Sequence, residues 1–227
     1  MEFKNMSMGG LVRRYIAPQM LGLVVNSLYF IVDGVFIGRR LGTDALAAAG
    51  VAVPLVELTI ALAMMLSVGS SVMIAAAKGA GNAGEGRRVF NVALGVILGC
   101  SLAVMVLGCA FTPALARVLG AGKAILQDTV TYLRPFLAFS PFFIFSYALS
   151  TYVRNDGQPK LAMMALTLGS LMNILLDYLF IVPLNMGIGG AALATGLGPC
   201  FSVALLLPHF LRKKGSPYLE KTKMDGG

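Results

Sequence analysis

The sequence has little charge, no tryptophan, one histidine and three cysteines. Charged residues make up 12% of its 227 residues and hydrophobic residues 57%, whereas soluble domains carry about 25% charged residues. This composition excludes a water-soluble globular fold, and the abundance of apolar residues excludes a disordered chain. An odd number of cysteines, all within apolar runs, argues against a disulfide framework or a zinc site.

Apolar runs of membrane-spanning length account for most of the chain. Each can cross about 30 Å of hydrocarbon at about 1.5 Å per residue. We therefore predict an all-α, polytopic membrane protein: six transmembrane helices over residues 1–211 and a basic tail over 212–227. The first run is too long for the apolar part of a signal peptide, so we expect it to be retained. The predicted spans are about 15–38, 47–74, 88–112, 130–152, 161–183 and 188–211.

The basic residues are divided unevenly between the two ends of these spans. Of the 18, 13 fall on the side of the termini and five on the other side. The positive-inside rule then predicts that both termini are cytoplasmic, as an even number of spans allows. The net charge of +8 is thus explained by topology. We predict no nucleic-acid partner, because basic and aromatic residues do not interleave as a base-stacking surface requires.

Three acidic residues, Asp33, Glu57 and Asp177, lie inside predicted spans. A carboxylate at the membrane centre costs about 2.5–3.5 kcal/mol on insertion scales, so each marks a candidate functional site. Counted from the outer end of its span, Asp33 is about 8 Å deep, Asp177 about 9 Å and the hydroxyl residue Thr195 about 10 Å. Side chains from three spans at one depth predict a shared site in the outer half of the membrane.

Two further amides lie on the same helix faces as the acids. Asn173 precedes Asp177 by four residues, and Asn26 precedes Asp33 by seven. Clusters of oxygen atoms suit a hard cation such as Na⁺. Two neighbouring carboxylates suit reversible protonation, because both cannot stay ionised at low cost. The cluster therefore predicts coupling to Na⁺ or H⁺; hydrogen bonding between helices is the alternative role, and it suits Asn26 and Thr195 equally well.

Glu57 lies about 18 Å from the outer end of its span, one turn after Pro54. It either faces a cavity, where it attracts a cationic substrate, or pairs with a neighbouring helix. The sequence favours neither role over the other.

Several motifs along the chain occur in an order known from one family of transporters. They are VDGVFIG at 32–38, ALAAAGVAVP at 45–54, RNDGQPK at 154–160, NILLD at 173–177 and GIGGAALAT at 187–195. Together they resemble the first lobe of the multidrug and toxic compound extrusion (MATE) family, and most closely its MepA-like bacterial branch. The resemblance covers nearly the whole chain.

The resemblance implies a function and a set of site residues. It implies an antiporter of the bacterial cell (inner) membrane that exports amphipathic or cationic drugs, is driven by Na⁺ or H⁺, and needs no other cofactor. In such a protein, Asp33, Asn173, Asp177 and Thr195 hold the coupling Na⁺ or proton. Tyr147 is the nearby polar candidate on the fourth span, and with Asn26 and Glu57 it makes up the possible substrate cavity.

One departure from the family is large. Its members have twelve spans in two lobes with the drug cavity between them, whereas this sequence has six spans and a tail at 212–227 that resembles an interlobe linker. We therefore expect a second six-span lobe as partner, in a homodimer or as a separate chain. The alternative is a truncated lobe or an assembly subunit that does not transport. We do not expect an enzyme, because no nucleophile–base pair or metal-ligand set is visible.

Overall fold

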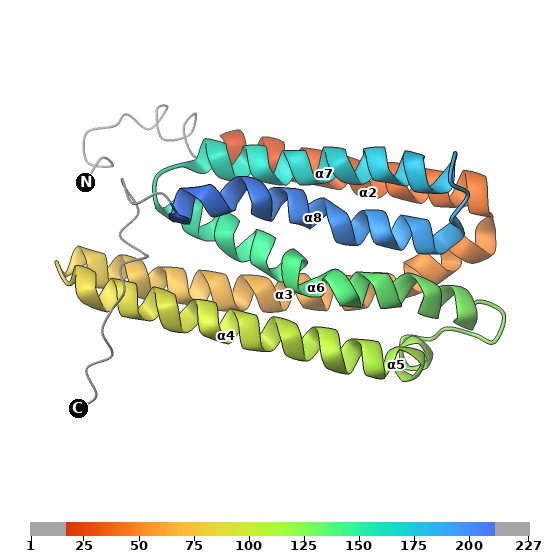
Figure 1. Cartoon of the computed structure of the whole chain (residues 1–227), viewed down its shortest axis with the longest axis horizontal. Helices are drawn as coiled ribbons and strands as arrows, with labels where there is room; N and C mark the ends of the chain where they lie inside the picture. The colour runs from red at the N-terminus through yellow and green to blue at the C-terminus, as the bar shows by residue number, and fades with distance from the viewer. Residues whose placement is uncertain (1–16, 212–227) are drawn as a thin grey trace.

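The structure, a computed structural model, describes residues 17–211 as a bundle of helices joined by short turns (Figure 1). Six of the helices are long and apolar enough to cross a membrane, and α5 is a short additional helix. The prediction of an all-α fold with six transmembrane helices is confirmed. The helices are α2 (Ala17–Leu41), α3 (Thr43–Gly79), α4 (Ala83–Ala110), α5 (Thr112–Val118), α6 (Leu126–Asn155), α7 (Pro159–Ile181) and α8 (Gly187–Leu211).

The long helices lie side by side along one axis and alternate in direction, and α6 runs through the middle of the bundle (Figure 1). Helix α6 contacts α3, α4, α7 and α8, while α2 packs chiefly on α7. In the most apolar 18-residue window of each helix, 67% of α6 is buried but only 17% of α4. Helix α6 is therefore the core helix, and α4 is a peripheral helix whose apolar side chains face outwards.

Both ends of α4 differ from the sequence prediction. We expected the third span to cover 88–112, but α4 begins earlier, at Ala83, and ends at Ala110. Asn82 caps its start: the Asn82 Oδ1 atom accepts from the Glu85 N–H at 3.2 Å, and the Asn82 Nδ2 atom donates to Glu85 Oε2 at 3.0 Å. The break after Ala110 precedes Pro113, which lacks a backbone donor and starts α5 as a separate helix.

Buried hydroxyl groups in the spans bond mainly to their own helix. Ser67 donates to the Ala63 carbonyl at 2.7 Å, and Thr112 donates to the Gly108 carbonyl at 2.8 Å. Such bonds satisfy a hydroxyl in a bilayer core that offers no water. These side chains are therefore structural and do not mark a binding site.

The basic residues of the described part are spread evenly over the two ends of the bundle. Five lie at the end where α3 meets α4 and α6 meets α7, and five at the opposite end (Figure 1). The other eight, which give the predicted excess on one side, lie outside the described residues, as does the predicted tail 212–227. The cytoplasmic location of both termini therefore stays a prediction.

Asp156 connects three helices at one end of the bundle. It follows α6, and its carboxylate accepts from Lys78 Nζ of α3 at 3.2 Å and lies 3.1 Å from His209 Nε2 of α8. The side chains of Asp156 and His209 are 12% and 10% exposed, so little water competes for the bond between them, whereas the Lys78 side chain is exposed. These bonds connect the ends of α3, α6 and α8.

Replacing Asp156 with alanine is expected to lower the stability of the bundle by about 1–2 kcal/mol, because a mostly buried carboxylate with two partners is lost. The measurement is the unfolding temperature of the purified chain in detergent. Asp44→Ala, which removes an exposed carboxylate at the start of α3, serves as the control and should have a smaller effect. Equal effects of the two substitutions would contradict a fastening role.

Candidate functional site

Three helices bring the predicted coupling residues together inside the bundle. Helix α2 carries Asp33, α7 carries Asn173 and Asp177, and α8 carries Thr195; α7 packs against both α2 and α8. All four side chains are buried, with exposed fractions of 7% for Asp33, 3% for Asn173, 0% for Asp177 and 5% for Thr195. Burying polar groups this deep in an apolar bundle costs free energy unless they hydrogen-bond to one another or bind a ligand.

The carboxyl groups of Asp33 and Asp177 lie next to each other, close enough to interact directly. Two ionised carboxylates have only acceptor atoms, so such a contact requires a proton on one of them or a cation between them. On each residue the Oδ1 atom is buried and has no hydrogen-bond partner among the described residues. The pair therefore presents two oxygen atoms with unused acceptor capacity.

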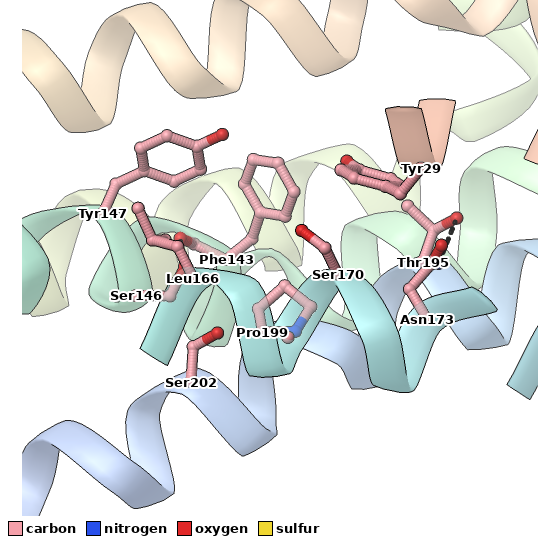
Figure 2. Close-up of a pocket in the computed structure, with 11 residues that line it drawn as sticks. Tyr29, Phe143, Ser146, Tyr147, Leu166, Ser170, Asn173, Thr195, Pro199 and Ser202 are labelled. Atoms are coloured by element: carbon pink, nitrogen blue, oxygen red, sulfur yellow. Dashed lines mark hydrogen bonds between the residues drawn. The ribbon is translucent and has the colours of Figure 1, made fainter. Parts of the chain in front are cut away.

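Asn173 links this pair to Thr195. In the orientation drawn in Figure 2, the Asn173 Nδ2 atom lies 3.5 Å from Thr195 Oγ1. With the amide turned over, its nitrogen donates to Asp177 Oδ2 at 3.2 Å and its oxygen accepts from the Thr195 N–H at 3.1 Å, so both amide groups are satisfied. The amide in this orientation links the Asp177 carboxylate on α7 to the backbone of α8.

Two tyrosines complete the cluster, and the sequence analysis missed both. Tyr132 of α6 is buried beside Thr195, while Tyr29 of α2 is buried one turn before Asp33. The spacing of four residues between Tyr29 and Asp33 is a signal that could have been used. No comparable signal exists for Tyr132, because it comes from a helix on which none of the predicted coupling residues lies.

Most of the described chain matches a known family of proteins. The family model described as MatE matches residues 18–179 of this chain. The chain belongs to the MatE family. Its fold and the matched relatives make it a multi-pass membrane protein.

Curated relatives of this MatE chain are named as multidrug resistance or multidrug export proteins. It is 27% identical over 220 residues to the probable multidrug resistance protein YoeA of Bacillus subtilis, covering 93% of this chain and 48% of YoeA. It is 26% identical over 197 residues to the multidrug export protein MepA of Staphylococcus aureus, covering 86% of this chain and 43% of MepA. The chain therefore spans about half the length of the curated relatives it matches.

Solved structures show the same relation. The MatE chain superposes on the outward-facing conformation of a multidrug resistance MATE family transporter with a TM-score of 0.84 at 30% identity, over 92% of this chain and 46% of that chain. For an inward-facing conformation of such a transporter the TM-score is 0.79 at 28% identity, over 88% and 47% of the two chains. The described bundle thus has the fold of about half of a MATE transporter.

A cavity of about 30 Å³ adjoins the cluster of this MatE lobe. Tyr147 lines it, and so do Asn173 and Thr195 (Figure 2); the role of Tyr147 in a substrate cavity stays a prediction. A space of this size holds about one water molecule. The cavity inside the lobe is therefore large enough for water or a small ion and too small for a drug.

The other two predicted cavity residues do not join the cluster. Glu57 is exposed on the outer surface of α3, about the middle of that helix. Asn26 belongs to α2, but its side chain lies outside the described part of the structure. The lobe thus separates an internal site, built on the two aspartates, from a carboxylate on its surface.

Proposed function

We propose that this chain is one lobe of a multidrug efflux transporter, and that Asp33 and Asp177 hold the Na⁺ or H⁺ that drives export. The observation that carries the proposal is a pair of neighbouring buried carboxyl groups, each with a buried oxygen that has no hydrogen-bond partner among the described residues. Neither Asp33 nor Asp177 forms an ion pair with another described residue. A proton or a cation is the remaining way to offset the repulsion between two buried carboxylates.

The surrounding groups are suited to a hard cation. The unpartnered Oδ1 atoms of the two aspartates, the Thr195 hydroxyl and the Asn173 amide oxygen are the kinds of oxygen ligand that Na⁺ takes. With its nitrogen donating to Asp177 and its oxygen accepting from the Thr195 N–H, the Asn173 amide holds the Asp177 carboxylate in place beside Thr195.

A transporter built on this lobe needs a second lobe. Alternating access generally moves one bundle against another around a central site, and the chain spans about half the length of its relatives. We propose a second six-span lobe, in a homodimer or on another polypeptide, in the bacterial inner membrane with both termini cytoplasmic. The names of the relatives refer to multidrug resistance and multidrug export, and we propose amphipathic or cationic drugs as the substrates. The alternative is a lobe that folds and assembles but does not transport.

Glu57 identifies the face of the lobe on which a drug cavity would form. Gly50, Pro54, Glu57 and Ala61 are all exposed and lie on one face of α3, at helical spacing. Lipid tails cannot solvate a carboxylate near the membrane centre. We propose that this face lines a water-filled space between two lobes, where Glu57 attracts cationic drugs.

Replacing Glu57 with glutamine is expected to weaken the binding of a cationic drug about tenfold, because one charge-assisted contact is lost. A neutral amphipathic drug should bind unchanged, and Glu57→Asp should retain most of the binding of the cation. Binding is measured by fluorescence titration of the assembled protein in lipid nanodiscs. Equal loss for cationic and neutral drugs would show that Glu57 only supports packing.

The proposal as a whole is tested by drug efflux from bacteria that lack their main exporters and express this chain alone. Chemical crosslinking reports how many chains assemble, and Asp33→Asn controls for the coupling site. Efflux that is lost in Asp33→Asn would show that six spans suffice, as a dimer. Absence of efflux from well-inserted chains would reject transport by this chain alone and favour the non-transporting or two-chain alternative.

A further inference from the structure

A groove of about 430 Å³ runs between α3 and α4, on the opposite side of α6 from the site described above. Its walls come from Leu66 and Met73 of α3 and from Val89, Val92 and Val96 of α4. Measured along the helices from the α3–α4 turn, it extends to a depth of about 20 Å, since Leu66 and Val96 both lie 13 residues from that end. This is close to the depth of one leaflet, about 15 Å of hydrocarbon plus the head-group layer.

The groove is apolar along its length. Val92 is 60% exposed and Met73 is 59% exposed, so the walls are open to the surroundings of the bundle. The one hydroxyl in the wall, Ser70, is already bonded to Tyr152 at 2.7 Å and to the Leu66 carbonyl at 2.7 Å. No polar group along the wall therefore demands a polar ligand, and the groove suits a hydrocarbon chain.

Two charges of opposite sign lie at one end of the groove. Glu85 and Arg88 both line it, three residues apart in the first turns of α4, and both are exposed. Residues at this spacing are neighbours on one helix surface. Glu85 uses Oε2 to accept from Asn82, which leaves further acceptor capacity on its carboxylate. The nearby Lys78 is bonded to Asp156, so the charges that line the groove itself are one negative and one positive.

We propose that this groove binds a phospholipid with a phosphoethanolamine head group. The acyl chain lies between α3 and α4, the Arg88 guanidinium binds the phosphate, and the Glu85 carboxylate accepts from the primary ammonium group. Guanidinium and phosphate form paired hydrogen bonds. A choline head group has no N–H to donate, and an anionic head group without an amine leaves Glu85 facing a like charge. The groove therefore selects phosphatidylethanolamine over both.

The absence of tryptophan from the chain makes a direct test possible. A single tryptophan is placed in the groove by Val96→Trp, and in a matched control outside it by Leu98→Trp. Val96 is 46% exposed and Leu98 is 47% exposed, and Leu98 does not line the groove. Each variant is reconstituted in phosphatidylcholine nanodiscs with a minor fraction of a lipid that carries bromine on its acyl chain, which quenches a nearby tryptophan.

At position 96, brominated phosphatidylethanolamine is expected to quench about fivefold more effectively than brominated phosphatidylcholine, the difference that one exposed ion pair supports. At position 98 the two lipids should quench equally. Glu85→Gln, which keeps an acceptor for Asn82, should abolish the preference for ethanolamine over choline. Arg88→Gln should weaken the binding of both lipids.

Three results would overturn the proposal. They are equal quenching by all lipids at both positions, stronger binding of an anionic lipid than of phosphatidylethanolamine, and protection of position 96 from every lipid, which would show that protein covers the groove. Native mass spectrometry of the unsubstituted chain, mixed with equal amounts of the two lipids, provides a test that needs no tryptophan. Retention of phosphatidylcholine as strongly as phosphatidylethanolamine in that experiment would also reject the proposal.

Discussion

Replacing Asp177 with asparagine is expected to abolish the stabilisation of this chain by its coupling cation. A ligand at about 100 times its dissociation constant adds about 2.7 kcal/mol to the stability of a folded protein. For a chain of this size that is roughly 5–10 °C in unfolding temperature. Asp177 is fully buried against Asp33, so its substitution removes a ligand and half of the paired charge.

The measurement is the unfolding temperature of the purified chain as Na⁺ replaces choline at constant ionic strength, repeated over a range of pH. If the site holds Na⁺, the unsubstituted chain is stabilised by Na⁺. If it holds H⁺, it is stabilised on acidification, because neutralising one carboxylate removes repulsion within the pair. Asp33→Asn should remove the response as Asp177→Asn does, whereas Asp156→Asn, which alters a carboxylate outside the pair, should keep it. A full response in both pair variants would reject the assignment.

Replacing Gly198 with alanine is expected to destabilise the lobe by about 1–3 kcal/mol, the cost of an added methyl group in a packed interface. Helices α7 and α8 lie close together at Gly169 and Gly198. A Cβ atom on Gly198 would lie 2.8 Å from the Gly169 carbonyl oxygen and 3.2 Å from Asn173 Cβ. Because backbone cannot yield as a flexible side chain does, the two helices must separate.

This separation also reaches the candidate ion site. Asn173 on α7 contacts Thr195 on α8 and Asp177 within its own helix, so moving the helices apart disturbs the amide that links them. We therefore expect Gly198→Ala to weaken the response to the cation as well as to lower the unfolding temperature. The control is Gly95→Ala in α4, where nothing lies within 4 Å of the added Cβ and alanine favours the helix. Equal unfolding temperatures for the two variants would contradict the close approach.

Helical rise alone was enough to predict that Asp33, Asp177 and Thr195 lie at one depth, and the structure places them in one buried cluster. The rise per residue gives the depth of a side chain along its helix, but it does not show which neighbouring helix that side chain faces. For that reason the sequence did not include Tyr132 in the cluster, and it left two roles open for Glu57. The contact between Gly169 and Gly198 likewise depends on how α7 and α8 pack, which no local pattern of small residues specifies.

The ends of the helices were less predictable than their number. Pro113 and the Asn82 cap fix the true bounds of α4 through single residues, whereas the apolar run suggested 88–112. The bond between Asp156 and His209 joins residues 53 positions apart, so no short-range spacing could predict it. The predicted orientation in the membrane depends on basic residues outside the described part of the chain. Contacts within the bundle give no information about it.

The most direct test of the account is an infrared difference spectrum of the carboxyl groups in the purified chain. Our central claim is that Asp33 and Asp177 together hold one exchangeable positive charge. We predict a C=O band from a protonated carboxyl group that disappears when Na⁺ is added or the pH is raised, and that is absent or shifted in Asp33→Asn and Asp177→Asn. A spectrum with no such band, unchanged by Na⁺ and by pH, would contradict the claim.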